Sequence, residues 1–246
     1  MDRAMWVIAK YKPVSLFSFR SGVVTSSGAK TLFLPTPFAI RTALLDVVIR
    51  THGLTAVEEA MDWIKELSIA VYPPERVVVS NVFAKCLKPT REDNTDKEGD
   101  KSAMTSSISF REYAQLDGVL SLALGVAEAH IVELENLLMQ VNYFGKRGSF
   151  FQLIDKPDVA SDLPSEFISL DGIFLEGASV KGKLPEQFQL GLIQIMDDWG
   201  KTLTFSKLNI YAEEELKKGR DRVRKSVVLP YRLERTSRGF SFYRRF

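Results

Sequence analysis

The order of the predicted elements in the first two thirds of the chain constrains its fold more than any other feature. Trp6 to Phe19 alternates and is rich in Val, Ile, Tyr and Phe, which predicts a first strand. The pattern that follows predicts a helix, two strands, a second core helix and a last strand. This is a split β-α-β order, typical of domains in which two helices pack against an antiparallel sheet.

The helices have recognisable ends. Thr36 is a suitable N-cap, Pro37 a suitable first helical residue and Gly53 a suitable C-terminal glycine for the first helix. An amphipathic helix is predicted next, from Leu54 to Ala70, and the second core helix from Glu128 to Val141. Because apolar residues recur at helical spacing, we expect each core helix to bury one face.

A long polar segment separates the two middle strands, which are predicted at Val77 to Leu87 and within Ile108 to Val126. Lys88 to Ser107 holds almost no apolar residues, and such a stretch cannot offset the entropy that it loses on ordering. Composition alone therefore predicts an ordinary mobile loop. If the two strands pair, the segment becomes the tip of a long projecting hairpin, at about residues 77–126.

A glycine-punctuated turn leads into the last strand of this unit, in the segment Asn142-Tyr-Phe-Gly-Lys-Arg-Gly-Ser-Phe-Phe151. Gly145 and Gly148 let backbone N–H groups approach a phosphate closely, and Lys146 and Arg147 add positive charge at the same place. We therefore predict an α+β fold, a ferredoxin-like (RRM-like) βαββαβ domain with a long β-hairpin. The sheet face of such domains often holds single-stranded RNA.

The last third of the chain is predicted to be a small β-rich addition. A segment rich in Pro, Asp and Ser follows residue 155, so we expect a division into residues 1–155 and 156–246. Short strands are predicted in the addition at Phe167 to Leu175, Leu203 to Tyr211 and Ser226 to Leu233.

The end of the chain is strongly basic. From Lys217 to Phe246, eleven Lys or Arg residues stand against two acidic ones, a net charge of +9. The rest of the chain therefore carries −7, which gives the total of +2. This asymmetry, with aromatic residues among the cations, indicates either contact with a nucleic acid or a solvated basic surface.

Composition excludes several classes of protein. Hydrophobic residues make up 45% and charged residues 26% of the 246 residues, as expected of a soluble globular protein. The longest apolar runs, such as Val119 to Val126, are far shorter than the roughly 20 residues that span a bilayer. Cys86 is the single cysteine, so no internal disulfide can form, and with two distant histidines it does not give a zinc motif. Since the N-terminus also lacks the layout of a signal peptide, we expect a cytoplasmic protein without metal or cofactor.

Three segments, taken in order, resemble one known family. They are Leu34-Pro-Thr-Pro-Phe-Ala-Ile-Arg-Thr-Ala-Leu-Leu45, Phe110-Arg-Glu-Tyr-Ala-Gln-Leu-Asp-Gly118 and Asn142-Tyr-Phe-Gly-Lys-Arg-Gly148. In this order they resemble the CRISPR-associated repeat-associated mysterious proteins (RAMPs), and the Cas-five family most of all. The resemblance extends over about residues 1–155, and the last third matches only in being a variable addition.

The resemblance implies a subunit of a type I CRISPR surveillance complex (Cascade), which acts in antiviral defence. Members of this family hold the 5′ handle of the CRISPR RNA (crRNA), cap the filament of backbone (Cas-seven) subunits and contact the large subunit. Target DNA would be met only indirectly, and no membrane partner is implied. The hairpin would correspond to the family's thumb, which kinks the guide RNA.

Contacts to such an RNA are expected from cations on phosphates and from bases stacked on aromatic side chains. The two tyrosines among the candidates have a second interpretation, because an aromatic residue at strand spacing more often belongs to the core. Arg20 has a second interpretation as a plain surface charge. The RNA-binding candidates are Gly145, Lys146, Arg147, Gly148, Arg41, Arg50, Arg111, Arg20, Tyr143 and Tyr113.

We expect no catalytic residues. One branch of the family cleaves precursor RNA without a metal, which needs a base for the 2′-hydroxyl and a cation for the phosphate. Here the glycine-rich segment has Lys146 but no neighbouring histidine, because His52 lies at a helix end and His130 beside an apolar helix face. The alternative is a metal-independent endoribonuclease that processes precursor crRNA with Tyr143, Lys146 and His52. A small-molecule or regulatory ferredoxin-like domain is a third possibility, but it leaves the basic end unexplained.

Overall fold

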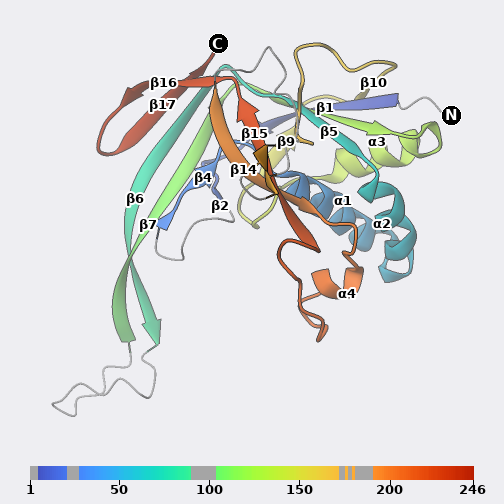
Figure 1. Cartoon of the computed structure of the whole chain (residues 1–246), viewed down its shortest axis with the longest axis horizontal. Helices are drawn as coiled ribbons and strands as arrows, with labels where there is room; N and C mark the ends of the chain where they lie inside the picture. Colours follow the sequence, from blue (N-terminus) through green and yellow to red (C-terminus); the bar gives the residue numbers. More distant parts are fainter. Residues whose placement is uncertain (1–4, 21–27, 90–103, 172–174, 177–178, 181–190) are drawn as a thin grey trace.

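The central sheet of the protein is antiparallel and has six strands in the part of the chain that the structure describes. The computed structural model describes residues 5–20, 28–89, 104–171, 175–176, 179–180 and 191–246. The order of the strands is β10-β1-β8-β5-β11, and β9 also pairs with β1 (Figure 1). The prediction that the fold contains both strands and helices is therefore confirmed, and strands are the more numerous among the described elements. The strands are β1 (Met5–Pro13), β5 (Ser68–Tyr72), β8 (Leu120–Val126), β9 (Phe151–Leu153), β10 (Asp158–Ala160) and β11 (Ile168–Ser169).

Helix α1 (Pro37–His52) has the ends that the sequence predicts. The Thr36 side chain accepts a hydrogen bond of 3.2 Å from the N–H of Ala39, which makes it the N-cap. Gly53 follows the helix at φ 81° and donates to the Ile49 carbonyl at 3.1 Å. The capping residues thus place the N-terminus of α1 at a fixed point of the chain.

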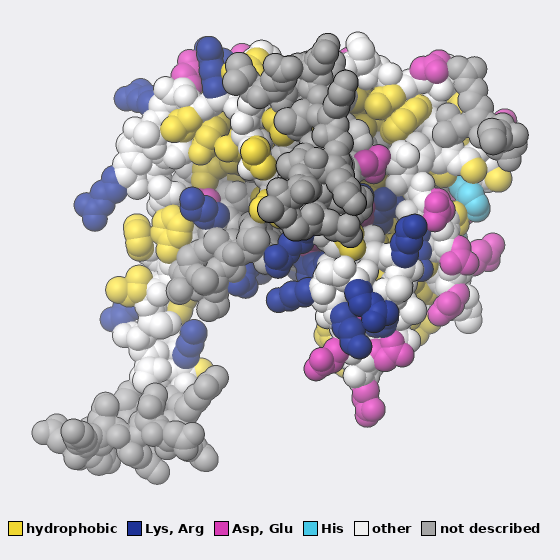
Figure 2. All heavy atoms as spheres, in the orientation of Figure 1, with side chains coloured by type: hydrophobic (Ala, Val, Ile, Leu, Met, Phe, Trp, Pro, Cys, Tyr) yellow, Lys and Arg dark blue, Asp and Glu magenta, His cyan; other side chains and the backbone are white. Residues whose placement is uncertain are grey.

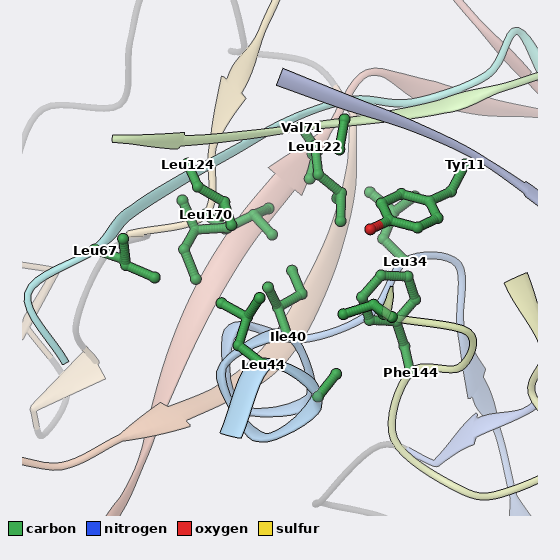
Figure 3. Packing of buried hydrophobic residues seen from close by; sticks show 14 of the residues in the cluster. Tyr11, Leu34, Ile40, Leu44, Leu67, Val71, Leu122, Leu124, Phe144 and Leu170 are labelled. Atoms are coloured by element: carbon green, nitrogen blue, oxygen red, sulfur yellow. The ribbon is translucent and has the colours of Figure 1, made fainter. Parts of the chain in front are cut away.

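The core lies between the central sheet and the helices. Ile40 and Leu44 of α1 point toward Val71 and Leu122 of the sheet (Figure 3), and all four are at most 1% exposed. Tyr11 is also buried and donates to the Leu138 carbonyl at 2.7 Å, and its burial raises the pKa of the phenol well above its ordinary value. The remaining helices are η1 (Leu54–Ala56), α2 (Val57–Lys65), η2 (Glu128–His130), α3 (Ile131–Gln140) and α4 (Phe205–Leu208).

The helix predicted from Leu54 to Ala70 is wrong in its second part. Helix α2 ends at Lys65, and β5 begins at Ser68 and pairs with β8. In β5 Ile69, Ala70 and Val71 are all buried, so the strand has no polar face that would produce an alternating pattern. A short continuous apolar run of this kind cannot be distinguished from a buried helical turn by its periodicity.

A long hairpin projects from the body of the molecule (Figure 1). Its strands β6 (Arg76–Pro89) and β7 (Met104–Asp117) pair without interruption from Arg76–Asp117 to Pro89–Met104. The predicted limits of about 77–126 need correction, because Gly118 turns the chain at φ 121° and β8 then enters the central sheet. Of the predicted mobile tip, residues 88, 89 and 104–107 are paired strand, and the rest lies outside the described residues.

The first predicted strand is also shorter than expected. β1 ends at Pro13, which has no N–H to continue a ladder, and β2 (Phe19–Arg20) pairs instead with β4 (Thr31–Leu32). Gly28–Ala29 (β3) pairs with β7.

The last third is β-rich, as predicted, but its elements differ in detail. β14 (Leu192–Trp199) pairs with β15 (Arg222–Leu229), and the strand expected at Leu203 to Tyr211 is replaced by the short helix α4. β16 (Tyr231–Thr236) and β17 (Phe240–Arg245) form a hairpin that extends the ladder of β6 and β7. Much of the basic segment therefore consists of paired strand. The remaining strands are β12 (Leu175–Glu176) and β13 (Ser179–Val180).

The division near residue 155 stays a prediction. β9 and β10 lie on either side of it, and both pair with β1. Leu170, Met196 and Trp199 belong to the same buried cluster as the residues of α1. None of the helices among the described residues combines the length and the apolar character needed to span a membrane.

Candidate nucleic-acid interface

The glycine turn is a closed and well-anchored loop. Gly145 and Gly148 have φ 65° and 103°, values that favour glycine. The Ser149 N–H donates to the Lys146 carbonyl at 3.0 Å, and the N–H of Phe144 donates to the Ser149 carbonyl at 3.3 Å. Phe144 and Ser149 are buried, whereas the four residues between them are exposed. The fold therefore holds both ends of the turn and presents its middle to solvent.

The backbone N–H groups of residues 145–148 make no hydrogen bond within the described part of the chain. Successive unpaired N–H groups in a tight turn form a concave binding site for an anion. The side chains of Lys146 and Arg147 lie at the same place, and no ion pair of either is found among the described residues. The turn therefore offers both directed donors and unneutralised charge.

The turn packs against the start of α1. A Cβ atom on Gly145 would lie 3.6 Å from Cδ1 of Phe19 and 3.7 Å from Cβ of Ala39. Ala39 stands in the first turn of the 16-residue helix. A helix N-terminus carries a partial positive charge and attracts anions, so it adds to the field of the turn.

These elements enclose a cleft of about 620 Å³. Figure 2 shows Lys and Arg side chains around the hollow between the hairpin and the lobe that carries α4, whereas many acidic side chains lie on the outer side of that lobe. The lining combines the β2 region, the start of α1, strand β7, the glycine turn, β14 and β15. Its described residues are Leu16, Phe17, Ser18, Phe19, Arg20, Thr36, Phe38, Ala39, Thr42, Arg111, Tyr113, Gly145, Lys146, Arg147, Gly148, Ser149, Asp197 and Arg222.

The structure brings together most of the residues that the sequence singles out. The whole segment from Gly145 to Gly148 lines the cleft, together with Arg20, Arg111 and Tyr113. These residues come from positions about 125 apart in the chain. They become neighbours because Phe17 forms a bridge with Ala114 of β7 and because the glycine turn packs against Phe19 and Ala39. Their contact with RNA stays a prediction.

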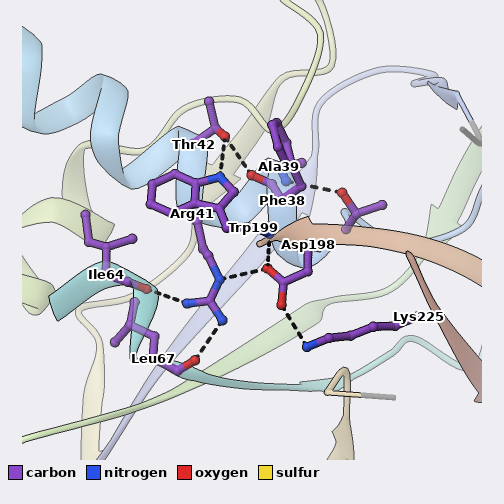
Figure 4. A network of polar contacts seen from close by, with 10 residues as sticks. Phe38, Ala39, Arg41, Thr42, Ile64, Leu67, Asp198, Trp199 and Lys225 are labelled. Carbon is purple, nitrogen blue, oxygen red and sulfur yellow. Dashed lines mark hydrogen bonds and ion pairs between the residues drawn. The ribbon is translucent and has the colours of Figure 1, made fainter. Parts of the chain in front are cut away.

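The prediction that Arg41 is an RNA-binding residue needs correction, because this side chain lies in the interior and not at the cleft. Its side chain is 5% exposed and its Nε lies 2.9 Å from Oδ1 of Asp198 (Figure 4). It also donates to the carbonyls of Ile64 and Leu67, the latter at 2.9 Å. The guanidinium therefore ties α1 to the end of α2 and to β14, and it is not available to a phosphate.

Arg50 and Tyr143 lie in a second, smaller cavity of about 270 Å³ beside the cleft. Arg50 pairs with Asp46 at 2.9 Å and donates to the Gln140 carbonyl at 3.3 Å. Arg147 lines both this cavity and the cleft, so it connects them. An extended ligand that leaves the cleft past Arg147 would meet Tyr143 next.

Two charged residues of the cleft were not among the candidates predicted from the sequence. Arg222 and Asp197 come from the last third of the chain and form an ion pair, with the Arg222 guanidinium carbon 4.4 Å from the ring centre of Phe38. The excess of cations after residue 217 was a signal for Arg222, but it did not distinguish this arginine from its neighbours. No pattern in the sequence marks Asp197.

The three residues of the alternative ribonuclease do not meet. Lys146 lines the cleft, Tyr143 the second cavity, and His52 a third cavity next to α3. His52 is the last residue of α1, 13 residues beyond Ala39, against which the glycine turn packs. His130 stacks on Trp63 at 4.9 Å between ring centres, in agreement with the packed position that we predict. Within the described residues, no group of three or more His, Cys, Asp or Glu side chains is placed so that it could hold a metal ion.

Comparison with known proteins supports the resemblance seen in the sequence. No protein-family model matches the chain. The chain is 28% identical over 141 residues to the CRISPR-associated protein Cas5 of Archaeoglobus fulgidus, and the match spans 57% of this chain and 56% of that protein. The chain therefore matches only about half the length of this relative. The predicted similarity to the Cas-five family is confirmed.

Two solved structures are similar over most of their length but at low scores. One is a CRISPR protein from Archaeoglobus fulgidus, with a TM-score of 0.45 and 11% identity, covering 98% of this chain and 92% of that one. The other is a chain of a CRISPR RNA-guided surveillance complex, with a TM-score of 0.38 and 13% identity, covering 92% and 89%. Neither likeness bears on the site.

Proposed function

We propose that this chain is a Cas5-type subunit of a type I CRISPR surveillance complex and that its cleft holds the 5′ handle of the crRNA. The observation that carries the proposal is the convergence of the exposed glycine turn, the N-terminus of α1 and five Lys or Arg side chains on one cleft. The sequence similarity to Cas5 supplies the class of complex.

The proposed fold of the first part is ferredoxin-like. Taking β9 and β10 together as the last strand, the sheet order is last-first-third-second, with α1 after the first strand and α3 after the third. A split β-α-β unit has this order. The hairpin of β6 and β7 is then an insertion between the second and third strands, where the thumb would stand.

The cleft would bind RNA mainly through its phosphates. Lys146, Arg147 and the N–H groups of the turn provide charge and directed donors for one phosphate, and Arg20 and Arg111 lie along the same cleft. Tyr113 in the cleft and Tyr143 beyond Arg147 offer surfaces for unstacked bases. Such an arrangement suits a single strand, because its bases are free to turn toward the protein.

The remaining parts of the proposal concern partners and chemistry. The hairpin projects far enough from the body to meet a neighbouring subunit, for which the backbone (Cas-seven) subunit is the candidate, and the large subunit is the second protein partner. Target DNA would be reached only through the complex, and the complex would act in the cytoplasm. The subunit would bind RNA without cleaving it, since His52 and Lys146 line different cavities.

The test is binding of a single-stranded RNA that carries the repeat sequence of the chain's own CRISPR locus. The double variant Lys146→Ala/Arg147→Ala should weaken binding and flatten its salt dependence, because each lost phosphate contact on a single strand lowers the log–log slope by about 0.7. Binding is measured by fluorescence anisotropy at several salt concentrations.

The matched control is Lys217→Ala/Lys218→Ala, an adjacent pair of exposed cations that does not line the cleft. This control should leave the slope nearly unchanged. An equal effect of both double variants, or no effect of the first, would show that the cleft does not hold the RNA.

A further inference from the structure

The cleft contains one feature that phosphate binding does not explain. Among its described lining residues, Asp197 is the only acidic one beside five Lys or Arg. It is 8% exposed, so its charge is poorly screened by water. A carboxylate in this place repels the phosphates that the rest of the cleft attracts, which suggests a separate task.

The geometry of Asp197 leaves half of its carboxylate unused. Nε and Nη2 of Arg222 both contact one oxygen, Oδ2. The second oxygen, Oδ1, and the Nη1 group of Arg222 make no hydrogen bond within the described part of the chain. Oδ1 is also not enclosed, since it is absent from the buried polar atoms that lack a partner among the described residues. The pair lines the cleft and therefore has one acceptor and one donor without a partner among the described residues.

Neighbouring residues hold this pair in place. On the other face of β14, Asp198 is bound by Arg41 and by Lys225, both at 2.9 Å (Figure 4). The indole N–H of Trp199 donates to the Thr42 hydroxyl of α1 at 3.3 Å. These contacts fix β14 against the helix, so Asp197 cannot move away from the cleft without breaking buried bonds. Preorganised groups of this kind are the basis of specific recognition.

Phe38 completes the arrangement. Its ring lies under the Arg222 guanidinium, 4.4 Å from ring centre to Cζ, at the N-terminal turn of α1. The Arg222 side chain is 41% exposed and lines the cleft. An aromatic ring against one face of a planar guanidinium limits its rotation, so the direction of the Nη1 donor is fixed.

We propose that Asp197 and Arg222 recognise one nucleobase of the bound RNA, a deepening that rests on the proposed function. Oδ1 of Asp197 accepts a hydrogen bond from an exocyclic amino group, and Nη1 of Arg222 donates to the neighbouring acceptor of the same base. Adenine, cytosine and guanine carry such an amino group and uracil does not. The glycine turn thus positions the RNA by its phosphate, while the pair from β14 and β15 supplies sequence preference.

The competing explanation is that Asp197 only orients Arg222 toward a phosphate. The two explanations differ in what the variant Asp197→Asn does. In that variant the amide oxygen takes the place opposite Arg222, and the amide N–H₂ donor then faces the base. Recognition of an amino group should therefore be lost, because two donors then face the base, whereas a purely orienting role predicts a uniform loss for every base.

The experiment measures binding of the repeat RNA and of a panel in which each position carries each of the four bases in turn. For the wild type, uracil at one position should bind about 5- to 150-fold more weakly than the best base, the range expected for a paired hydrogen-bond contact. Asp197→Asn should abolish that difference and leave the salt slope unchanged. Asp158→Asn is the control, because Asp158 forms an exposed pair with Lys10 outside the cleft.

A wild-type protein that binds RNA without discriminating against uracil at any position overturns this inference and leaves the proposed function standing. So does an Asp197→Asn protein that keeps the discrimination. A wild-type protein that binds none of the RNAs overturns the proposed function itself. If Asp197→Asn lowers the melting temperature by more than a few degrees, Arg222→Gln provides the second test, and it should reduce the discrimination at the same position.

Discussion

Replacement of Arg41 by alanine should destabilise the whole molecule, although a surface arginine on the same helix should not. The Arg41 guanidinium pairs with Asp198 and donates to the carbonyls of Ile64 and Leu67, and both charged side chains are at most 5% exposed. Arg41→Ala removes all three contacts. It removes the guanidinium donor from the Leu67 carbonyl and from the Ile64 carbonyl, which still accepts from the Leu67 N–H. It also leaves Asp198 with Lys225 as its remaining cation among the described residues.

The magnitude follows from the cost of breaking a buried ion pair by removing one partner, about 3–5 kcal/mol. For a chain of this size each kcal/mol lowers the melting temperature by about 2–4 °C, so a fall of roughly 6–20 °C is expected. Arg50→Ala is the matched control, since Arg50 is 44% exposed and its pair with Asp46 one helical turn away is worth only about 0.3–0.5 kcal/mol.

The assay is urea unfolding followed by circular dichroism, supported by thermal melting. Arg41→Lys should recover only part of the loss, because an ammonium group cannot replace three separately directed guanidinium donors. If Arg41→Ala unfolds within about 1 kcal/mol of the wild type, or if Arg50→Ala is equally destabilised, then Arg41 does not hold α1, α2 and β14 together.

Two further predictions concern the acid range and catalysis. Hydrogen bonds from Thr202, from the Lys217 N–H and from Lys207 hold the pKa of Asp221 well below its ordinary value. The ionised carboxylate therefore stabilises the fold fully above about pH 4, and this stabilisation is lost as the pH falls further. The melting temperatures of the wild type and of Asp221→Asn should differ at pH 7 and converge toward pH 2. A difference that stays constant over that range would contradict the assignment. The purified protein should not cleave repeat RNA, and a discrete product that disappears in His52→Ala would restore the ribonuclease alternative.

Local signals along the chain were sufficient for the pieces that depend on a few adjacent residues. The start of α1 needs only the Thr36 hydroxyl and the ring of Pro37, and the glycine turn needs only two residues that tolerate positive φ. The candidates Lys146 and Arg147 belong to this turn, so their exposure was predictable together with it. The similarity to the Cas-five family came from the same local segments.

Strand β5 shows where local signals become ambiguous. Ile69 and Val71 belong to the main buried cluster, whereas Ala70, which points to the opposite face, belongs to a second cluster with Ala123 and Phe167, so both faces of β5 are covered. The spacing of polar and apolar residues shows which face of an element is exposed to solvent. An element with no exposed face has no such alternation in its sequence. Because β5 was predicted as helix, the hairpin strand at Val77 to Leu87 was taken as the second strand of the sheet. The predicted hairpin then extended to residue 126 and included β8, which belongs to the central sheet.

The sequence by itself determined the capped helix α1, the exposed glycine turn and the basic character of the last thirty residues, because each depends on neighbours along the chain. Only the tertiary structure decided that Arg41 is buried and that Asp197 and Arg222 enter the cleft. Arg41 and Asp198 are 157 residues apart, and they meet because β14 and β15 pack on α1. Burial and partnership of a charged side chain depend on which distant element covers it, and no pattern of adjacent residues contains that information.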